Sequence, residues 1–550
     1  MSAVLGINLS HDTSACLIKD GRVYAAEEER WSEIKHNTST FDDDYLFPEN
    51  SIRFVLEESG TDIKDLDHVV CVSMSGEDIP NEIIQTRSEL KCFRKVEYIS
   101  HHKAHILSAY LLSPFQEAVG LCVDGAGSML GNDVCSRERV SGYYLNEDTC
   151  VRLYQKYDRL SVQHGKIQKS KNSIGIFYEN MAKRCIPVGD EPQGSMMALA
   201  AFAVSPEKYY NEIRRFVTLY PTGEYQFHED IAQKNKTPYT IGAYHWIPGQ
   251  VENIPFQERA DFAAAVQRVY EEVLTHVLNE LYERTHVDNL VLSGGCGLNS
   301  KFNGIIQEKT HFKNVYVPPA PSDSGVSVGA ALYGWNILLK KDRLPTPLTA
   351  DFGPTVEELS DEECDELRRL GVQVFCEEEN KLCVKVADLI MNKKIVIWCR
   401  GAMEFGPRAL GNRSFIAHPG DAMLRDRMNN LKKRALFRPL APAVLEECFD
   451  AFFSGDADYY MNKVAYVRSS EQLAGVAHVD GSARVQLVTP SCPFYPLLKV
   501  MNEKYGIPVI INTSLNKKGK PIIRSKTQAI DAFFCLEVDA AVIGNTLLVK

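Results

Sequence analysis

Apolar residues along the chain repeatedly form short runs that end in glycine or polar residues. The first run, VLGINL, leads into SHDTSA, and a second, AVGLCV, leads into DGAGS. A third, NLVLS, leads into GGCGLNS. Runs of this length, closed by turn residues, predict buried strands. The likeness of the entries at 4–14 and 119–127 indicates that the first part of the chain contains two similar halves.

Segments with helical spacing separate these runs. Residues 50–60 follow a helical pattern that stops at Gly60, and a long helix is expected at 257–286. HHKAHILSAYLL, residues 101–112, follows Ser100, which is a favourable N-cap residue. Strands that alternate with helices predict an α/β fold.

The pattern changes after residue 340, where prolines and threonines precede the acidic segment EELSDEECDELRRL. We interpret 351–374 as a connector that carries one acidic helix. Beyond it, VKVADLIMNKKIVIWC and PFYPLLKVMNEKYGIPVIIN each read as a helix followed by a strand. Two domains are therefore expected, at 1–350 and 375–550.

Composition and charge narrow the function classes. The chain of 550 residues has a formal net charge of -11 and no long basic run, which argues against nucleic-acid or anionic-membrane partners. Its fifteen cysteines are scattered without a CxxC pair, so we expect reduced thiols and no zinc finger. The N-terminus lacks a signal-peptide pattern, and no apolar run is long enough for a membrane helix. A cytoplasmic location is expected, and the oligomeric state is left open.

Two histidines and two aspartates form a candidate metal site. His101 and His105 are four residues apart, so they share one face of the expected helix, whereas His102 points elsewhere. Asp124 ends an apolar strand and Asp323 lies in the loop PSDSG, and both are places where α/β folds present side chains to ligands. This set of residues suits a divalent transition metal.

Glycine-rich loops after strands are candidate nucleotide-binding elements, because glycine lets backbone amides approach phosphate oxygens. The order of the three loops matches the phosphate and adenosine loops of the actin and sugar-kinase fold. The candidate nucleotide-binding residues are Gly125, Gly127, Gly294, Gly295 and Asn299.

The second half carries cations among apolar, glycine and proline residues, in CRGAMEFGPRALGNRS and LKKRALFRPLAP. Cations in such surroundings need an anionic partner, and phosphate suits the guanidinium group. Internal ion pairs are the alternative. The cations are Arg408, Arg413, Lys432, Lys433, Arg434 and Arg438, and further candidates for the same pocket are Arg484, Asn512, Ser514 and Asn516.

These motifs resemble the O-carbamoyltransferases of the NodU/CmcH type, which modify antibiotics and nodulation factors and include the tobramycin enzyme. The resemblance rests on HDTSACL, AAEEERWSEIKH, HHKAHILSAY, VDGAGS, LSGGCGLNS, PSDSG, MEFGPRALGNRS, FRPLAPAVL and INTSLN, in this order along nearly the whole chain. One departure is GDEPQGSMMALA at 189–200, where many relatives carry GEEGKxMGLA. It puts acceptor contacts in doubt.

The resemblance implies an N-terminal actin/sugar-kinase-like domain, similar to the threonylcarbamoyl-transferase fold and two-lobed, and a C-terminal YrdC-like α/β domain. The second would form carbamoyl-adenylate from carbamoyl phosphate and ATP with Mg²⁺. The first, with Fe(II) or another divalent metal, would pass the carbamoyl group to a small-molecule alcohol. By motif matching, the metal ligands are His101, His105, Asp124 and Asp323; the catalytic residues are His11, Asp12 and Lys35; and the carbamoyl phosphate and ATP pocket contains Arg408, Lys432, Arg438, Arg484 and Ser514, with Asn512 from the polar turn.

Several points stay open at this level. His11 and Asp12 are both candidates for the general base, and the acceptor alcohol is unidentified. A tRNA threonylcarbamoyl enzyme would share both folds, although the acidic balance counts against it. Hydrogenase maturation proteins share them too but carry CxxC pairs. A non-catalytic actin-like nucleotide-binding module would explain the glycine loops but not Arg408, Lys432 and Arg438.

Overall fold

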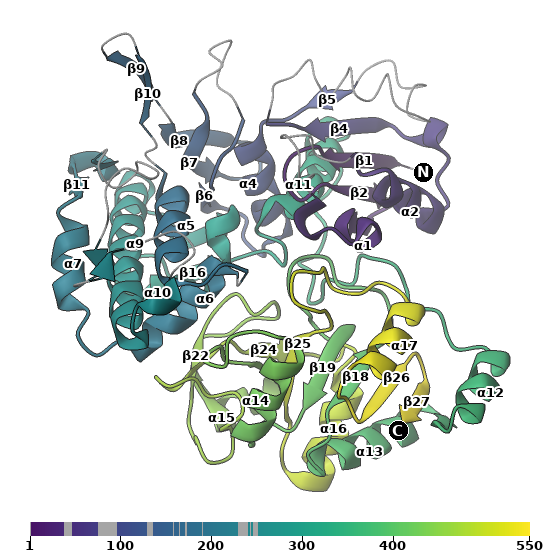
Figure 1. Ribbon diagram of the computed structural model, residues 1–550. Helices are drawn as coiled ribbons and strands as arrows, with labels where there is room; N and C mark the ends of the chain where they lie inside the picture. The colour runs from purple at the N-terminus through teal and green to yellow at the C-terminus, as the bar shows by residue number, and fades with distance from the viewer. Residues whose placement is uncertain are drawn as a thin grey trace. The chain divides into compact units, whose positions relative to one another are not determined.

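The computed structural model divides into two compact units, each discontinuous in sequence (Figure 1). The first unit contains Met1–Ser10, Cys16–Gly21 and Asp62–Thr346, and the second contains His11–Ala15, Arg22–Thr61 and Pro347–Lys550. The structure describes residues 2–37, 47–74, 96–128, 136–157, 159–163, 166–170, 173–189, 191–228, 240–241, 244–245 and 251–550. None of the described helices is both long and apolar enough to cross a membrane.

Two sheets of the first unit repeat one strand arrangement. In the first sheet, β1 (Ala3–Asn8) lies between β2 (Ser14–Lys19) and β4 (His68–Val72), and β4 is followed by β5 (Glu97–Tyr98). In the second sheet, β6 lies between β7 and β15, and β15 is followed by β16. The strands of this second sheet are β16 (Asn314–Tyr316), β15 (Asn289–Ser293), β6 (Ala118–Val123), β7 (Glu138–Leu145) and β8 (Cys150–Tyr157). The α/β class and the two similar halves predicted from the sequence are confirmed.

Two helices expected from the sequence pattern of the first unit are confirmed. The long helix is α9 (Phe256–Thr285), and the histidine-rich segment forms α4 (His101–Leu112). The other helices are α5 (Ile174–Cys185), α6 (Pro192–Leu199), α7 (Glu207–Arg214), α10 (Ser300–Lys309) and α11 (Val326–Leu332). Short hairpins pair β9 (Arg159–Gln163) with β10 (Lys166–Ser170), β11 (Val217–Leu219) with β12 (Tyr225–Phe227), and β13 (Thr240–Ile241) with β14 (Tyr244–His245).

Helices α4 and α11 pack against each other, α11 on β1 and β4 and α4 on β6 and β15 (Figure 1). Small residues allow this close packing. A Cβ atom on Gly329 of α11 would lie 1.9 Å from the carbonyl oxygen of Ala104 in α4, and one on Gly6 of β1 would lie 2.2 Å from that of Ser327. Since both obstacles are backbone atoms, no side-chain rotation relieves them. The small-residue pattern of α11 is therefore explained by backbone contact with α4 and β1.

Gly329→Ala should consequently destabilise the first unit. The added methyl group forces α4 and α11 apart, and we expect a loss of about 3 kcal/mol in the free energy of unfolding. Urea denaturation followed by circular dichroism measures it. Gly125→Ala is the matched control for stability, because a Cβ atom there meets nothing within 4 Å. Equal stability of the two variants would contradict the packing argument.

The second unit is built on a mixed sheet of eight strands (Figure 1). Their order is β17 (Gln373–Cys376), β27 (Thr546–Val549), β26 (Ala540–Ile543), β18 (Val396–Cys399), β19 (Arg413–Ala417), β25 (Val509–Ser514), β20 (Ala441–Leu445) and β24 (Gln486–Val488). A smaller sheet contains β21 (Phe453–Gly455), β22 (Ala465–Val467) and β23 (Ser482–Ala483).

Helices cover both faces of the eight-stranded sheet. α13 (Glu379–Met391) and α16 (Tyr495–Tyr505) pack on one face, and α14 (Ala422–Leu431) and α17 (Lys526–Cys535) on the other. Strand β18 alternates between the two cores, with Trp398 in one and Ile397 in the other. A strand buried on both faces reads as a continuous apolar run, as VIWC does. The acidic segment before the sheet forms α12 (Asp361–Arg369).

An N-terminal segment belongs to the second unit. It contains β3 (Arg22–Glu27), α1 (Glu29–Ser32), the 3₁₀ turn Lys35–Asn37 and α2 (Glu49–Ser59), which ends at Gly60 as predicted. A buried ion pair joins this segment to the motif EFGPRALG. Arg30 donates to both carboxylate oxygens of Glu27 at 3.0 and 3.2 Å and to the carbonyl oxygen of Gly406 at 2.8 Å. The N–H of Gly406 donates back to Glu27 at 2.7 Å, so both backbone groups of Gly406 are held.

Candidate active site

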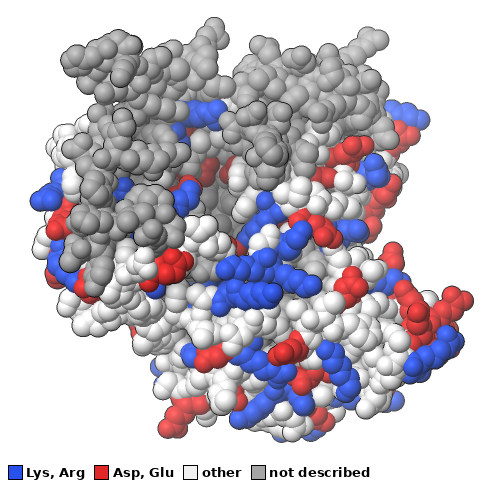
Figure 2. Space-filling view, in the orientation of Figure 1, with Lys and Arg blue, Asp and Glu red and all other residues white. Residues whose placement is uncertain are grey.

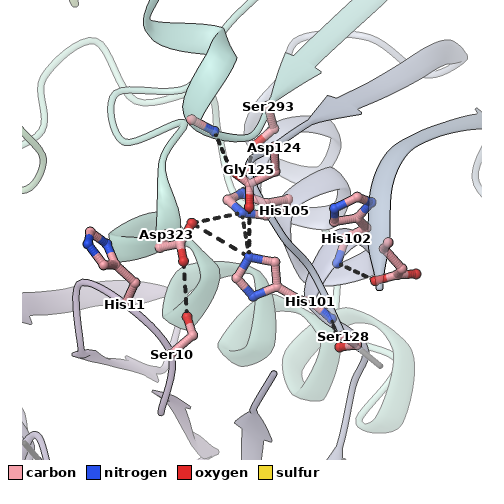
Figure 3. Close-up of polar contacts among 12 residues, drawn as sticks. Ser10, His11, His101, His102, His105, Asp124, Gly125, Ser128, Ser293 and Asp323 are labelled. Atoms are coloured by element: carbon pink, nitrogen blue, oxygen red, sulfur yellow. Dashed lines mark hydrogen bonds and ion pairs between the residues drawn. The ribbon is translucent and has the colours of Figure 1, made fainter. Parts of the chain in front are cut away.

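The four predicted metal ligands converge in the first unit (Figure 3). His101 and His105 project from one face of α4, Asp124 follows β6, and Asp323 precedes α11. Nε2 of His101 lies 3.1 Å from Nε2 of His105 and 3.3 Å from Oδ2 of Asp124. Oδ1 of Asp323 lies 3.5 Å from both Nε2 atoms. All four side chains are buried.

These separations fit a bound metal ion. An ion held about 2.0–2.2 Å from each ligand atom places neighbouring ligand atoms about 3.0–3.6 Å apart. The lone pairs of two imidazole rings can face each other at this distance only when a proton or a metal ion lies between them. Two imidazoles and two carboxylates make the mixed nitrogen and oxygen set that divalent transition metals accept.

Hydrogen bonds behind the ligands orient them toward this centre. The hydroxyl of Ser293 donates to the carbonyl oxygen of Pro321 at 3.2 Å, so its oxygen is left to accept the Nδ1–H of His105, also at 3.2 Å. Nε2 of His105 then carries the lone pair that a metal requires. Each carboxylate has one oxygen held by the protein, since Gly295 N–H donates to Asp124 Oδ1 and the Ser10 hydroxyl to Asp323 Oδ2. The other oxygen of each faces the centre.

The local charge also favours a cation. Although burial lowers it, the pKa of His101 is raised to about 10 by the carboxylates of Asp323 and Asp124. Burial raises the pKa of Asp124, but the hydrogen bond from His101 and the charge of His105 hold it below its usual range. Two ionised carboxylates in a buried site require a positive partner, which a divalent ion would provide.

Contacts at both ends fix helix α4. Ser100 occupies the predicted N-cap position, but its side chain makes no capping bond; the Oγ of Ser128 accepts the N–H of His101 at 2.9 Å instead. The N-cap position of Ser100 is confirmed, while a residue brought close by the tertiary fold supplies the side-chain acceptor at this end of the helix. At the other end Arg343 donates to the carbonyl oxygens of Tyr110, Ser113 and Phe115. A basic side chain there also suits the helix dipole.

His102 lies on another side of α4, as predicted. Its Nδ1 is 2.7 Å from the Oγ of Ser141, and burial lowers its pKa well below the usual value. A Cβ atom on Gly127 would lie 2.6 Å from the ring of His102. Gly127 thus makes room for a buried imidazole that lies outside the candidate metal site.

The other glycine-loop candidates also have structural partners. Gly127 N–H donates to the carbonyl oxygen of Glu138, Gly294 N–H to that of Pro321, and Gly295 N–H to Asp124, while Gly125 lies directly after Asp124. Asn299 caps α10 by accepting from Phe302 N–H at 3.1 Å, and it exchanges hydrogen bonds with Gln267. Nucleotide binding by these five residues stays a prediction.

Strand directions bring the predicted phosphate-binding residues of the second unit to one edge of its sheet. β25 is antiparallel to both β19 and β20, and β24 is parallel to β20. The end of β25 therefore lies beside the beginnings of β19, β20 and β24. These positions carry Ser514, the loop with Arg408, and the segments with Arg438 and Arg484.

Side-chain contacts join part of this set. Nζ of Lys432, at the end of α14, lies 3.2 Å from Ser514 Oγ and donates to Asn516 Oδ1 at 2.7 Å. Asn512 donates to the carbonyl oxygen of Ala409 at 3.0 Å and to Gln486 at 2.8 Å, which holds the loop beside the buried Arg408. Gln486 was missed from the sequence; its position two residues after Arg484 on a strand was the available signal.

Two of the remaining cations hold backbone groups. The buried Arg413 donates to carbonyl oxygens of Pro354, Arg400, Gly401, Asn412 and Arg524. Arg434 donates to Asn429 and to the carbonyl oxygen of Pro439. These contacts of the two arginines are made with neutral oxygen atoms of the protein.

The surface near this edge is basic. Lys517, Lys518 and Lys520 are exposed in the loop that follows β25. Figure 2 shows Lys and Arg side chains gathered in the middle of the view, where loops of the second unit lie. In a chain of net charge -11, such a local positive potential attracts anionic ligands.

The three predicted catalytic residues, His11, Asp12 and Lys35, all lie in the second unit. Asp12 accepts from Nδ1 of His11 at 3.0 Å and from Nδ1 of His36 at 2.6 Å. Burial raises the pKa of Asp12, but these two hydrogen bonds and the charges of both rings hold it below its usual range. Lys35 is half-buried next to His36, which was missed because 24 residues separate it from Asp12 in the chain.

The segment that carries Lys35 is attached to the loop after β25. Lys520 donates to the carbonyl oxygen of Glu33 at 3.2 Å, and Gln528 donates to the Glu33 side chain at 2.7 Å. The guanidinium of Arg524 lies 5.2 Å from the ring centre of Trp31. The candidate catalytic segment and the candidate phosphate pocket therefore share one structural unit.

Comparison with known proteins identifies relatives along the whole chain. It is 29% identical to the nodulation protein NolNO of Sinorhizobium fredii, over 98% of this chain and 79% of that protein. It is also 29% identical to the 3'-hydroxymethylcephem-O-carbamoyltransferase of Amycolatopsis lactamdurans, over 64% of each chain. Among solved structures, full-length HypF in the phosphate- and nucleotide-bound form matches with a TM-score of 0.36 and 14% identity, over 60% of this chain and 55% of that one.

Two family models match in the order of the sequence. The carbamoyltransferase N-terminus model matches residues 3–86 and 79–332, and the carbamoyltransferase C-terminus model matches residues 387–550. Together they include all the residues assigned above to the metal centre, the glycine loops and the basic edge. The chain therefore belongs to the carbamoyltransferase family and is an O-carbamoyltransferase of the NodU/CmcH type.

Proposed function

We propose that the protein makes carbamoyl-adenylate from carbamoyl phosphate and ATP and transfers the carbamoyl group to a hydroxyl of a small natural product. The main support is the basic edge of the second unit, where Arg408, Arg438 and Arg484 lie near neighbouring strand ends and Lys432, at the end of α14, contacts Ser514. The Amycolatopsis relative is named for a hydroxymethyl acceptor, and that name favours an alcohol.

Activation is chemically necessary because the carbon atom of a carbamate is electron-rich and its leaving group is poor. In a balanced route, water converts carbamoyl phosphate to carbamate and phosphate. An oxygen of the carbamate then attacks the α-phosphorus of ATP, and pyrophosphate leaves. The product, carbamoyl-adenylate, has AMP as a good leaving group.

The residues of the second unit suit this first half-reaction. The arginines and Lys432 would offset the charge of the phosphate groups, and Mg²⁺ would accompany ATP. Ser514 and Asn512 would add neutral donors. Lys35, on the segment attached to the loop after β25, would place a point charge near the phosphate of the adenylate.

In the second half-reaction, the acceptor hydroxyl attacks the carbonyl carbon while the bond to AMP breaks. We assign the general base to His11. Asp12 accepts two N–H groups and has a pKa below its usual range, so it is a weak base. With Nδ1–H directed at Asp12, the His11 ring keeps its lone pair on Nε2, which would take the hydroxyl proton. Fe(II) or another divalent ion, held by the four ligands of the first unit, would supply Lewis acidity toward an oxygen atom.

The test is exchange of radioactive pyrophosphate into ATP. We expect exchange that depends on carbamoyl phosphate, because adenylation is reversible while carbamoyl-adenylate stays bound. Acetyl phosphate is the control donor, since it lacks the carbamoyl amide. Exchange without carbamoyl phosphate, or none with it, would contradict the proposed route.

A further inference from the structure

His11, Asp12 and His36 form a cluster of titratable side chains in the second unit. The carboxylate of Asp12 lies between two imidazole rings, with Oδ2 3.0 Å from Nδ1 of His11 and Oδ1 2.6 Å from Nδ1 of His36. The ring centres are 4.9 Å apart, and the ring planes are inclined by 30°. Each imidazole ring therefore contacts a different oxygen of the Asp12 carboxylate.

This arrangement is typical of hydrogen bonding. A carboxylate only accepts, so each Nδ1 must carry the proton and each Nε2 the lone pair in the neutral rings. The shared acceptor thus selects one tautomer for His11 and for His36.

The backbone around this cluster is strained. Asp12 has φ 57° and His36 has φ 64°, which is the left-handed region that non-glycine residues rarely adopt. Two further hydrogen bonds hold the geometry: Asp12 N–H donates to the carbonyl oxygen of His36 at 3.2 Å, and His36 N–H donates to the side chain of Glu29 at 2.7 Å.

We propose that His36 is a positioning residue for carbamoyl transfer. By holding one oxygen of Asp12 with its ring and the N–H of Asp12 with its carbonyl oxygen, it fixes the carboxylate so that the other oxygen orients the ring of His11. His11 then presents Nε2 as the proton acceptor in a single orientation. This inference rests on the proposed function and adds His36 to the residues on which the transfer step depends.

Water serves as the acceptor in the test, because the natural alcohol is unidentified. Water attacks the carbonyl carbon of carbamoyl-adenylate, AMP leaves, and the proton passes to His11. Release of AMP measures this transfer, and pyrophosphate exchange measures adenylation separately. The variants are His36→Gly and His36→Asn, since both residues tolerate a left-handed φ but only asparagine keeps an N–H donor for Asp12.

We expect His36→Gly to slow AMP release about ten- to a hundredfold, the usual loss when a group that orients a functional imidazole is removed. His36→Asn should recover the rate to within about threefold of the unmodified protein. Exchange should stay within about twofold in both variants. His286→Gly is the control, because His286 also has a left-handed φ, of 52°, at the end of α9 in the first unit; its AMP release should be unchanged.

Three results would overturn the inference. AMP release at the normal rate in His36→Gly would show that the transfer step does not depend on the hydrogen bond from the His36 ring to Asp12. Equal losses in His36→Gly and His36→Asn would show that the hydrogen bond is not what matters. Exchange lost in parallel with AMP release in both variants would show that His36 does not act specifically on the transfer step. If the unmodified protein shows no exchange at all, the proposed function fails, and the inference fails with it.

Discussion

Lys432→Met should lower carbamoyl-phosphate-dependent pyrophosphate exchange about a thousandfold, comparable to the loss of one preorganised donor at a developing charge. Nζ of Lys432 is buried between Ser514 and Asn516 at the basic edge of the sheet, where a charge is only weakly screened. Methionine keeps the length and apolar surface of the side chain and removes the charge. Initial rates at saturating ATP measure the effect.

Lys433→Met is the matched control. It makes the same chemical change one residue further on, at an exposed side chain, and should retain exchange within about twofold. Ser514→Ala tests the same site with a smaller change, in case Lys432→Met unfolds the second unit, and should lower exchange about tenfold. Exchange near the normal rate in Lys432→Met would remove Lys432 from the substrate pocket.

His105→Ala should lose both the metal and carbamoyl transfer while keeping exchange. One of four ligands is removed, and the lone pair on Nε2 that Ser293 helps to orient disappears with it. We expect metal content after anaerobic loading with ferrous iron to fall from about one ion per chain to near zero. AMP release should fall at least about a hundredfold, and exchange should stay within about twofold.

His102→Asn is the control for this variant. His102 is also a buried imidazole of α4, but it contacts Ser141 outside the metal centre. Asparagine keeps a polar group there, and the metal content should be unchanged. If His105→Ala still binds one ion, or loses exchange to the same extent as AMP release, the assignment of metal and adenylation to different residues is wrong.

Local elements were predictable because their signals are short. The helix at His101–Leu112, the stop at Gly60 and the strand before Asp124 follow from the spacing of apolar residues and from turn chemistry. Membership of the N-terminal segment in the second unit was not predictable. It depends on Arg30 and Glu27 meeting Gly406, and nothing in the pattern of EEER distinguishes a buried ion pair from a solvated helix start.

In the candidate site, too, local features were predictable from the sequence and long-range contacts were not. The spacing of His101 and His105 indicated a shared helix face, and the strand end indicated Asp124. The glycine loops illustrate the limit of such patterns: Gly127 makes room for His102 and Gly295 N–H supports Asp124, yet both look like phosphate-binding glycines in the sequence. His36 could not be found because its link to Asp12 is a long-range hydrogen bond.

The hydrogen bonds that Glu27 and Arg30 make to Gly406 limit how the gene can be divided and recombined. A polypeptide starting at residue 347 would contain all eight strands of the large sheet, yet Gly406, in the motif that carries Arg408, would lose the partners of both its backbone groups. If the C-terminal halves of two relatives were swapped, the loop around Gly406 from one relative would meet the Glu27–Arg30 ion pair of the other. Hybrid enzymes should therefore inherit residues 11–61 and 347–550 from the same parent.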